Sequence, residues 1–397
     1  MDPLFESFTK ILRGLDTAFI RYLHNQIDWT DRLIAIKGGR GTGKTTLMLQ
    51  HIRDHIKTGP HVLYVSLDEL YFTSNSLVNL ADDFVKGGGK FLFLDEVHKY
   101  PTWSREIKNL YDTYRELKIV FTGSSMLEIA KGDADLSRRA VVYEITGLSF
   151  REFLAIENSL KVPVLKFNDI LSNHTAIAEE VVKKIKPLPA FKNYLRFGYY
   201  PYYQENKNNY HQRLATTINL VIESDLPSIE RVDYSTIQKL KKLLYVVSTS
   251  VPFKPNIQKL SEQIHATRGS TLLYLDYLKN AQLLNLLRSE TEGISYMNKP
   301  DKIYLNNTNL LYALAPDYAN TGTLRETFFY NQLKQIAKIT SSDKGDFKID
   351  GKIVAEVGGK NKTGEQIKGI AKSFIAADEI EIGLRNKIPL WLFGFLY

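Results

Sequence analysis

A glycine-rich segment constrains this chain more than any other feature of its sequence. The segment GGRGTGKT at 38–45 follows the apolar run RLIAIK and leads into the helical pattern TTLMLQHIRDHIK. It satisfies the spacing G-x-x-x-x-G-K-[ST], with Gly38, Gly43, Lys44 and Thr45 in the defining positions. Glycines allow such a loop to curl so that its backbone N–H groups point inward at anionic phosphates. The sequence therefore predicts a nucleotide site formed by Gly38, Gly39, Arg40, Gly41, Thr42, Gly43, Lys44, Thr45 and Thr46.

An apolar run that ends in two acids supplies the second half of such a site. The run KFLFLDEV at 90–97 places Asp95 and Glu96 at the end of a predicted strand. We expect Lys44 to reach the β- and γ-phosphates of ATP, and Thr45 and Asp95 to hold Mg²⁺. Glu96 is expected to polarise the attacking water as general base. The alternative is a strand end that happens to be acidic.

The letters DEVH at 95–98 also fit a DExH helicase box. That interpretation requires a second motor domain with its own arginine motif, and no such segment follows in the sequence. We therefore expect His98 to be a surface or loop residue.

The first third of the chain alternates short β-rich runs with amphipathic helical runs, which is typical of a parallel α/β sheet. Fifty-one positions separate Lys44 from Asp95, and another apolar run lies between them. This spacing favours the branch of phosphate-loop folds in which a strand lies between the phosphate-loop strand and the acidic strand. Strands are predicted at 33–37, 61–67, 90–95, 117–122 and 140–146, and helices at 45–57, 74–86 and 102–116.

Polar residues near two further strands are candidates for sensing the γ-phosphate. Ser124, in KIVFTGSS, is placed at the tip of the strand predicted next to the acidic one, where it can hydrogen-bond the γ-phosphate or the lytic water. Taken alone, TGSS is an ordinary turn. Arg138 and Arg139, in DLSRRAVVYEI, are candidates for a catalytic arginine supplied in cis or from a neighbouring subunit. A solvated basic pair is the alternative for these two residues.

With these segments in place, the chain resembles the AAA+-like ATPases of bacteria and archaea that carry an appended C-terminal domain of unknown function. The resemblance runs from about residue 17 to 376, through GGRGTGKTT, FLFLDEVHKYPTWSREIKNLYD, VFTGSSMLEI, LSRRAVVYEITGLSFREFL, YLRFGYYP, GTLRETFFYNQL and GDFKIDGKIVAEVGGKNK. It implies ATP and Mg²⁺ as cofactors and Arg139 as the family arginine, because the family pattern has a single Arg before the strand. Arg138 stays an alternative, since Ser-Arg-Arg replaces the more usual Gly-Arg ending.

Beyond residue 150 the β signal fades and the pattern indicates further parts. In a winged-helix interpretation, the second helix of a helix-turn-helix pair offers Arg268, Ser270, Thr271 and Lys279 for contacts with DNA. The alternative is a protein–protein adaptor or packing unit in which leucines of this helix, Leu273 among them, form the core. The predicted division is a P-loop ATPase core at 1–150, a helical lid at 151–232, a winged-helix-like module at 233–318 and a nuclease-like α/β domain at 319–397.

Three acids near the end of the chain are similar in order to the PD-(D/E)xK nuclease arrangement. Glu326 lies on a predicted helix, Asp346 starts one predicted strand and Glu356 lies on the next. In that arrangement, acids on adjacent strands hold a divalent metal, and a nearby lysine steadies the attacking water.

The candidate lysine departs from the nuclease pattern. Lys360 follows Glu356 two residues later than the pattern requires, behind two glycines. Strand alternation lets Lys360 face the same side, whereas the glycines permit a bend that carries it away. Gln366, on a helix predicted near 365–376, is the supporting candidate. The alternative is a retained fold used for docking or for binding nucleic acid.

Composition excludes several classes of protein. The 397 residues contain no cysteine, which excludes a disulfide scaffold, a thiolate metal site and a cysteine nucleophile. The first residues lack a secretory pattern, and no apolar run approaches the roughly 20 residues that span a bilayer. We therefore expect a cytoplasmic protein without a membrane partner. The net charge of 52 − 44 = +8 hints at nucleic acid, but a bland basic surface explains it equally well.

The sequence thus predicts an α/β, Mg²⁺-dependent ATPase that couples nucleotide state to C-terminal modules acting on DNA. Two alternatives stay open. One is a regulatory switch with slow hydrolysis that binds a protein partner or a second copy of the chain. The other is an ATP-gated, metal-dependent nuclease.

Overall fold

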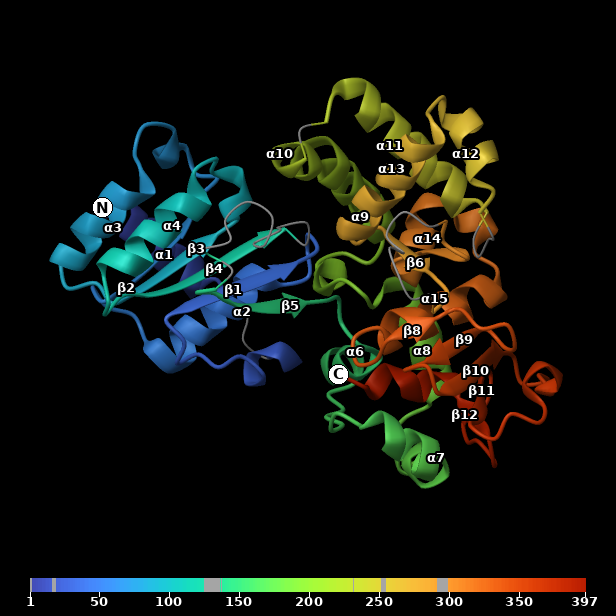
Figure 1. The fold of residues 1–397 in the computed structure, drawn as a ribbon. Helices are drawn as coiled ribbons and strands as arrows, with labels where there is room; N and C mark the ends of the chain where they lie inside the picture. Colours follow the sequence, from blue (N-terminus) through green and yellow to red (C-terminus); the bar gives the residue numbers. More distant parts are fainter. Residues whose placement is uncertain are drawn as a thin grey trace. The chain divides into compact units, whose positions relative to one another are not determined.

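The computed structural model describes residues 2–15, 19–124, 136, 138–230, 232–250, 255–290 and 299–397. The chain forms two compact units, whose ribbons are drawn in Figure 1. The N-terminal unit comprises Met1–Gly147 together with Glu223–Val232, and the C-terminal unit comprises Leu148–Ile222 together with Asp233–Tyr397. The chain therefore leaves the N-terminal unit, returns to it for one short segment, and leaves it again.

The N-terminal unit is built on a five-stranded sheet in the order β2-β3-β4-β1-β5, in which every pairing is parallel. This confirms the predicted parallel α/β sheet. β4 lies between the strand that leads into the glycine-rich segment, β1, and the strand that ends in the two acids, β3. The strands are β1 (Leu33–Gly38), β2 (Val62–Ser66), β3 (Phe91–Asp95), β4 (Lys118–Ser124) and β5 (Val141–Ile145).

Both faces of this sheet are covered by helices (Figure 1). Apolar side chains alternate along each strand: Leu33 and Ala35 pack with the helices α3 and α4, whereas Ile34 and Ile36 pack with α2 on the other face. Successive strand residues point to opposite faces, so an unbroken apolar strand can fill two cores at once. The helices are α1 (Asp2–Arg13), α2 (Lys44–His51), α3 (Leu77–Lys86), α4 (Trp103–Thr113) and α10 (Leu226–Ile229), and α2 continues into a π-helical turn, Ile52–Ile56.

The parallel direction of the strands decides where polar residues meet. Gly38 ends β1, Asp95 ends β3 and Ser124 ends β4, so all three lie at the carboxyl edge of the sheet. In open α/β sheets this edge is where ligands bind.

The C-terminal unit begins with a helical segment that packs on the end of the chain. The Ser149 hydroxyl caps the first helix, and the side chain of Glu152 completes a capping box there. Phe150 packs against Phe395 with ring centroids 5.8 Å apart. Residues 151–222 of the predicted helical lid belong to the same compact unit as the tail, whereas residues 223–232 belong to the N-terminal unit. The helices of this segment are α6 (Phe150–Glu157), α7 (Phe167–Val182), α8 (Pro187–Phe197) and α9 (Tyr210–Leu220), followed by the π-helical turn Val221–Asp225.

Three helices and an antiparallel pair of strands follow in the segment predicted as winged-helix-like. They are α11 (Tyr234–Ser248), α12 (Ile257–Ile264), α13 (Arg268–Asn280) and the antiparallel pair β6 (Leu284–Leu287) and β7 (Lys302–Leu305). The winged-helix assignment itself stays a prediction. Within it, Thr271 is buried and bonded to Ser261, so it is not available to DNA, whereas Leu273 is 48% exposed and does not belong to a core.

The tail forms a second five-stranded sheet in the order β12-β11-β10-β9-β8. β10 pairs parallel with β11 and antiparallel with β9, and α15 packs on the sheet through Phe329, whose ring centroid lies 5.3 Å from that of Phe347. The elements are α14 (Thr308–Leu314), α15 (Thr321–Leu333), β8 (Ile339–Thr340), β9 (Phe347–Ile349), β10 (Ile353–Gly358), β11 (Ser373–Ala377) and β12 (Lys387–Pro389).

The helix predicted near 365–376 is wrong. A single 3-10 turn at Glu365–Ile367 stands there, followed by strand β11. Gly364 and Gly369 have φ of 78° and 80°, a left-handed conformation that a continuing α-helix does not contain. These two glycines therefore end the turn on both sides. In the part of the chain that the structure describes, no helix is both long enough and apolar enough to cross a membrane.

Candidate functional site

The glycine-rich segment forms a tight loop between β1 and α2. Gly41 and Gly43 have φ of 77° and 95°, and Gly43 is the residue that precedes the first turn of α2. A Cβ on Gly38 would lie 2.4 Å from the carbonyl oxygen of Ile145, so only glycine fits beside the end of β5. The loop therefore adopts a curl that requires glycine at these positions, with the N-terminus of α2 at its base.

Arg21 joins this loop to the chain that follows β5 by hydrogen bonds, which the sequence did not predict. Its buried guanidinium donates to the carbonyl of Thr42 and, at 2.8 and 3.1 Å, to those of Thr146 and Gly147. The three acceptors come from the loop and from the chain just after β5. Nothing near Arg21 in the sequence indicates this contact, because its partners are 21 to 126 residues away.

Lys44 points into the loop. Its ammonium group is buried and donates to the carbonyl oxygens of Gly38 at 3.1 Å and Gly39 at 3.2 Å. Thr42 donates to the same Gly39 carbonyl at 2.8 Å, which tightens the turn. Thr46, in the first turn of α2, is exposed. The loop thus concentrates N–H groups and one ammonium group at the carboxyl edge of the sheet.

Thr45 and Asp95, predicted as the two metal ligands, lie in contact. The Thr45 hydroxyl donates to one carboxylate oxygen of Asp95 at 2.6 Å. The hydroxyl of Tyr64 donates to the same oxygen at 2.9 Å, and that of Thr122 donates to the other. Burial and the neighbouring Asp95 carboxylate raise the pKa of Tyr64 above its usual value, so Tyr64 stays a donor. Tyr64 and Thr122 hold Asp95 from two neighbouring strands.

Glu96 adopts a left-handed backbone conformation, with φ of 50°. Its N–H donates to Asp95 at 3.1 Å and to the Thr122 hydroxyl at 3.2 Å. A residue other than glycine pays about 1–3 kcal/mol for such a conformation, which persists only where neighbouring contacts enforce it. The Glu96 side chain is 24% exposed and its carboxylate lies 3.5 Å from Nε2 of His98. It therefore stands beside Asp95 at the site, with access to solvent.

His98 is buried, so its predicted surface position is wrong. Its Nδ1 accepts a 3.4 Å hydrogen bond from the backbone N–H of Ser124, which assigns the remaining proton to Nε2. Nε2 faces Glu96 and, at 3.8 Å, Asp225. Ser124 therefore lies at the end of β4, next to β3, as predicted. His98 contacts Ser124 through Nδ1 and faces the carboxylates of Glu96 and Asp225 through Nε2.

Asp225 joins the site from the short segment that returns to the N-terminal unit. Arg40 of the loop contacts both of its carboxylate oxygens, at 3.0 and 3.2 Å, and Lys99 contacts one of them at 2.7 Å. Burial alone would raise the pKa of Asp225, but the nearby His98 ring, the hydrogen bond from Lys99 and the charge of Arg40 hold it well below its usual value. Asp225 is therefore a buried anion between the phosphate loop and the turn after β3, and its 185-residue separation from Arg40 hid it from sequence analysis.

Arg139 does not lie near the loop of its own chain. Its guanidinium forms a two-pronged ion pair with Asp112 of α4, at 2.9 and 3.1 Å. β5 pairs in parallel with β1 from Val141 to Ile145, and Arg139 precedes its first residue. Arg139 thus stands at the amino edge of the sheet, about 20 Å along the strand direction from the phosphate loop. Arg138, its neighbour, is exposed.

Two of the three acids of the tail, Glu326 and Asp346, meet at one lysine. The ammonium of Lys302 on β7 lies 3.2 Å from Glu326 and 3.3 Å from Asp346. Burial alone would lower the pKa of Lys302, but the two carboxylates raise it above its usual value, so the ammonium stays charged. Tyr304 also donates to Glu326, at 2.7 Å, and the backbone N–H of Val357 donates to Asp346 at 2.9 Å.

The lysine that pairs with Glu356 is Lys362 and not the predicted Lys360. Lys362 lies 2.9 Å from Glu356, whereas Lys360 is exposed. A Cβ on Gly358 would lie 2.8 Å from the side chain of Lys362, so the chain folds back over this glycine. Gln366 is exposed in the 3-10 turn and does not belong to this group.

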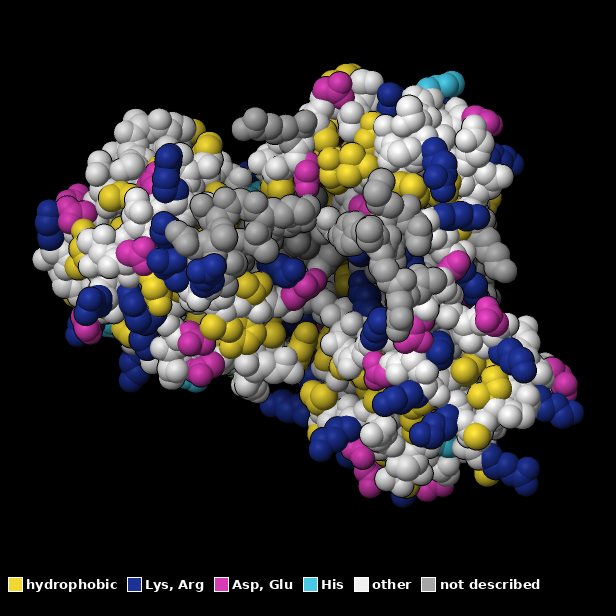
Figure 2. All heavy atoms as spheres, in the orientation of Figure 1, with side chains coloured by type: hydrophobic (Ala, Val, Ile, Leu, Met, Phe, Trp, Pro, Cys, Tyr) yellow, Lys and Arg dark blue, Asp and Glu magenta, His cyan; other side chains and the backbone are white. Residues whose placement is uncertain are grey.

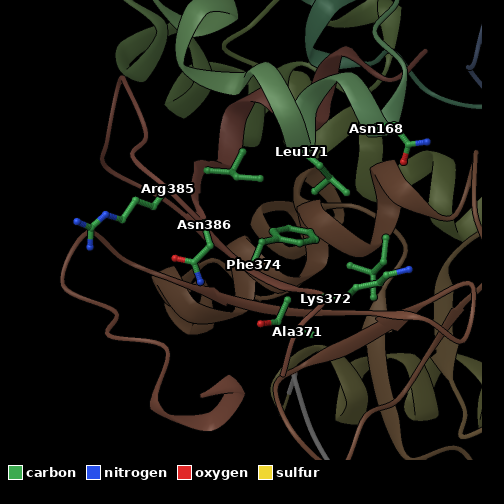
Figure 3. A pocket seen from close by; sticks show the side chains of 10 residues that line it. Asn168, Leu171, Ala371, Lys372, Phe374, Arg385 and Asn386 are labelled. Atoms are coloured by element: carbon green, nitrogen blue, oxygen red, sulfur yellow. The ribbon is translucent and has the colours of Figure 1, made fainter. Parts of the chain in front are cut away.

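A separate pocket of about 450 Å³ opens on the C-terminal unit (Figure 3). Its wall combines apolar side chains, such as Leu171 and Phe374, with the positive charges of Lys372 and Arg385. No residue of the phosphate loop or of the acidic group lines it. The lining residues are Asn168, Leu171, Ile353, Ala371, Lys372, Ser373, Phe374, Arg385, Asn386 and Ile388.

Two stretches of the chain match known families. Residues 30–154 match a family described as AAA domain (AAA_14), and residues 188–321 match a domain of unknown function (DUF8612). The first stretch contains the phosphate loop, Asp95, Glu96 and Ser124. Residues 30–154 are therefore similar to AAA domains. The second match names neither a winged helix nor a nuclease.

The chain is also similar to a full-length relative and, weakly, to solved structures. The relative is the uncharacterized protein MJ1637 of Methanocaldococcus jannaschii, 29% identical over 277 residues, which are 66% of this chain and 58% of the relative. AMPPCP-bound DnaA from Aquifex aeolicus is 14% identical, with 69% of this chain and 86% of that chain covered and a TM-score of 0.26. The S. cerevisiae Hsp104–ADP complex is 15% identical, with 69% and 40% covered and a TM-score of 0.33. TM-scores this low establish no shared fold over the whole chain.

Proposed function

We propose that this protein is a Mg²⁺-dependent ATPase. The observation that carries the proposal is the contact between Thr45 and Asp95, whose oxygens converge at 2.6 Å directly beside the phosphate loop. A hydroxyl and a carboxylate are the oxygen ligands that Mg²⁺ prefers, and the chain has no thiolate to compete with them. The residues present therefore fit the ion that ATP hydrolysis requires.

In this proposal each residue acts where the structure places it. The Lys44 ammonium binds the β- and γ-phosphate oxygens in place of the Gly38 and Gly39 carbonyls. Thr45 and Asp95 would hold Mg²⁺, which would supply positive charge beside the same phosphates. The Glu96 carboxylate orients the attacking water and takes its proton.

ATP hydrolysis with Mg²⁺ and with chelator, measured with and without DNA at two salt concentrations, tests the proposal. We expect Mg²⁺-dependent phosphate release that chelation abolishes. Stimulation by DNA that weakens with salt would identify a phosphate-backbone ligand. On the face drawn in Figure 2, basic side chains are interspersed with acidic ones, so no single-sign patch marks a DNA surface there. Tight nucleotide retention with turnover at the blank level would contradict the ATPase and favour the regulatory switch.

We further propose that Asp225 couples nucleotide state to the C-terminal unit. The segment 223–232 packs in the N-terminal unit but is continuous at both ends with chain of the C-terminal unit. Arg40 lies in the phosphate loop and contacts Asp225 in this structure. Nucleotide phosphates would compete with the Asp225 carboxylate for the Arg40 guanidinium, because one guanidinium cannot fully pair with both anions.

Replacing Asp225 with asparagine is therefore expected to tighten ATP binding. The neutral amide releases Arg40 to the phosphates, and a gain of about 1 kcal/mol corresponds to roughly fivefold in Kd. Titration with a fluorescent ATP analogue measures the change. Asp68→Asn, at an acid of the same unit outside the Asp225 contacts, serves as the control. An unchanged or weaker affinity of D225N would contradict the competition.

We infer that Arg139 acts on the nucleotide of a neighbouring copy. Its position at the amino edge of the sheet separates it from the phosphate loop of its own chain. An arginine supplied in trans stabilises charge on the transferred phosphate. This role requires that copies of the chain assemble, at least transiently.

Arg139→Ala is expected to lower ATP turnover at least tenfold while leaving ATP affinity unchanged. Adding a Lys44→Ala protein, which retains Arg139 but lacks the phosphate-binding lysine, should partly restore turnover of the mixture. Steady-state phosphate release over a range of protein concentrations provides the measurement. Turnover that is unaffected by R139A, or a mixture no more active than its parts, would contradict action in trans.

A second candidate function, metal-dependent cleavage of nucleic acid, is favoured by one observation in the tail. The Glu356 side chain is 1% exposed, and its Oε2 has no hydrogen-bond partner among the described residues, although Lys362 pairs with Oε1. A cation would satisfy that oxygen. Against this, the Lys302 ammonium already pairs with Glu326 and Asp346, two of the carboxylates that a divalent metal would use.

Incubation of DNA with the protein and Mg²⁺ or Mn²⁺ decides between these readings of the tail. Cleavage that is lost in Asp346→Ala and kept in Asp343→Ala, an exposed acid of the same loop, would support the nuclease. Background cutting that is identical for the wild type and both variants would contradict the nuclease. The acids that pair with Lys302 would then have a structural or docking role.

A further inference from the structure

Three histidines of the N-terminal unit meet away from the phosphate loop. His24 lies in a 3-10 turn before β1, His51 is the last residue of α2, and His55 lies in the π-helical turn that follows. One ring nitrogen from each lies within 4.8 Å of the other two. His24 and His51 are buried and His55 is exposed, so the group opens to solvent on one side. The ATPase proposal uses none of these residues.

We propose that His24, His51 and His55 form a binding site for a divalent transition metal ion, with Zn²⁺ as its representative. The three imidazoles would occupy three positions of a tetrahedral site, and a water molecule would occupy the fourth. Imidazole nitrogens suit Zn²⁺, Cu²⁺ and Ni²⁺, whereas Mg²⁺ prefers oxygen. The site is therefore chemically distinct from the oxygen site of Thr45 and Asp95.

The distance between the two buried rings fits this ion. Nε2 of His24 lies 3.3 Å from Nδ1 of His51. Two nitrogens bound tetrahedrally at Zn–N distances of 2.0–2.1 Å lie about 3.3–3.4 Å apart. The two buried rings thus already have the spacing of two ligands on one ion. The exposed His55 ring would have to move closer to them to supply the third nitrogen.

The surroundings hold the two buried rings in place. Trp29 stacks on His51 with ring centroids 3.6 Å apart and planes 9° from parallel. The Trp29 indole N–H donates to the backbone carbonyl of His24 at 3.0 Å, which joins the same tryptophan to both histidines.

A bound ion would connect two segments of the N-terminal unit. His24 precedes β1 by nine residues, and α2 runs from Lys44 in the phosphate loop to His51. π-Helical turns of the kind that carries His55 occur frequently at functional sites. The ion would fix the far end of the helix that begins at the phosphate loop.

Titration of the tag-free, metal-stripped protein with Zn²⁺, followed by isothermal calorimetry in the absence of nucleotide, tests the site. We expect one Zn²⁺ per chain with submicromolar affinity. His55→Ala is expected to weaken binding at least tenfold, as loss of a ligand costs no less than loss of a supporting partner. Because His55 is exposed, its removal should leave the fold intact. His61→Ala, at a partly buried histidine of the same unit outside the group, is the matched control.

The visible absorption of a Co²⁺-loaded sample provides a second measurement. An intense tetrahedral band that H55A loses and H61A keeps would place the ion on this group. Stoichiometry well below one per chain, or equal affinity of the wild type and H55A, would overturn the proposal. Neither result depends on ATP turnover, so failure of the metal site and failure of the ATPase are distinguishable.

Discussion

Lys44→Ala is expected to remove ATP binding and ATP turnover together. The Lys44 ammonium is buried and directed at the inner rim of the phosphate loop, where it donates to Gly38 and Gly39. Truncating one partner of a buried, hydrogen-bonded charge pair costs about 2–5 kcal/mol. We therefore expect the Kd for ATP to rise roughly 30- to 3000-fold, since about 1.4 kcal/mol corresponds to a factor of ten.

Equilibrium titration with a fluorescent ATP analogue measures this loss. Lys86→Ala is the matched control, because Lys86 belongs to the same unit but is exposed and pairs with its helical neighbour Asp82. Circular dichroism should show the same helix content in both variants. ATP affinity in K44A within threefold of the wild type would show that the loop does not bind phosphates through this lysine.

Glu96→Gln is expected to separate binding from catalysis. The amide has the size of the carboxylate and leaves the contacts of the Glu96 N–H with Asp95 and Thr122 intact, so the left-handed backbone should persist. It cannot accept a proton from the attacking water. General-base catalysis contributes about 10²–10⁴ in rate, and we expect turnover to fall by this factor while the Kd for ATP changes by less than threefold.

Single-turnover hydrolysis and ATP titration of the same E96Q preparation provide the two measurements. Glu116→Gln, at an exposed glutamate of the N-terminal unit, is the control for loss of one negative charge. Wild-type turnover in E96Q would assign the base elsewhere, with Asp95 and His98 as the groups within reach. A parallel loss of binding would instead show that the carboxylate supports the site structurally.

Sequence was sufficient for those parts of the site that lie close together along the chain. The loop from Gly38 to Thr45 follows from eight consecutive residues, because phosphate binding requires glycine curvature, an ammonium and a hydroxyl at fixed offsets. The alternation of short β-rich runs with amphipathic helical runs predicted the parallel sheet, because parallel strands are joined by crossover helices. Parallel strands then bring Asp95 and Ser124 to the edge that carries the loop.

Errors arose where glycines decide the path of the backbone. The pattern near 365–376 indicated a helix, but positive φ at Gly364 and Gly369 limits it to one turn. The sequence left open whether Lys360 faces the side of Glu356 or is carried away by the two glycines, and the fold-back over Gly358 brings Lys362 to Glu356. A glycine permits several backbone conformations, so the surrounding packing selects among them and the sequence alone does not.

The sequence by itself determined the phosphate loop, the acidic strand end and the α/β class of the N-terminal unit, because these depend on short-range spacing and on the period of apolar residues. Only the tertiary structure decided which distant residues complete the site. Asp225 pairs with Arg40, Arg21 donates to the carbonyl of Thr42 in the loop, and Tyr64 donates to Asp95. The tertiary structure also decided the meeting of His24 with His51 and the placing of Arg139 at the opposite edge of the sheet. Such contacts join residues far apart in the chain, and their geometry is set by the packing of strands and helices rather than by any local pattern.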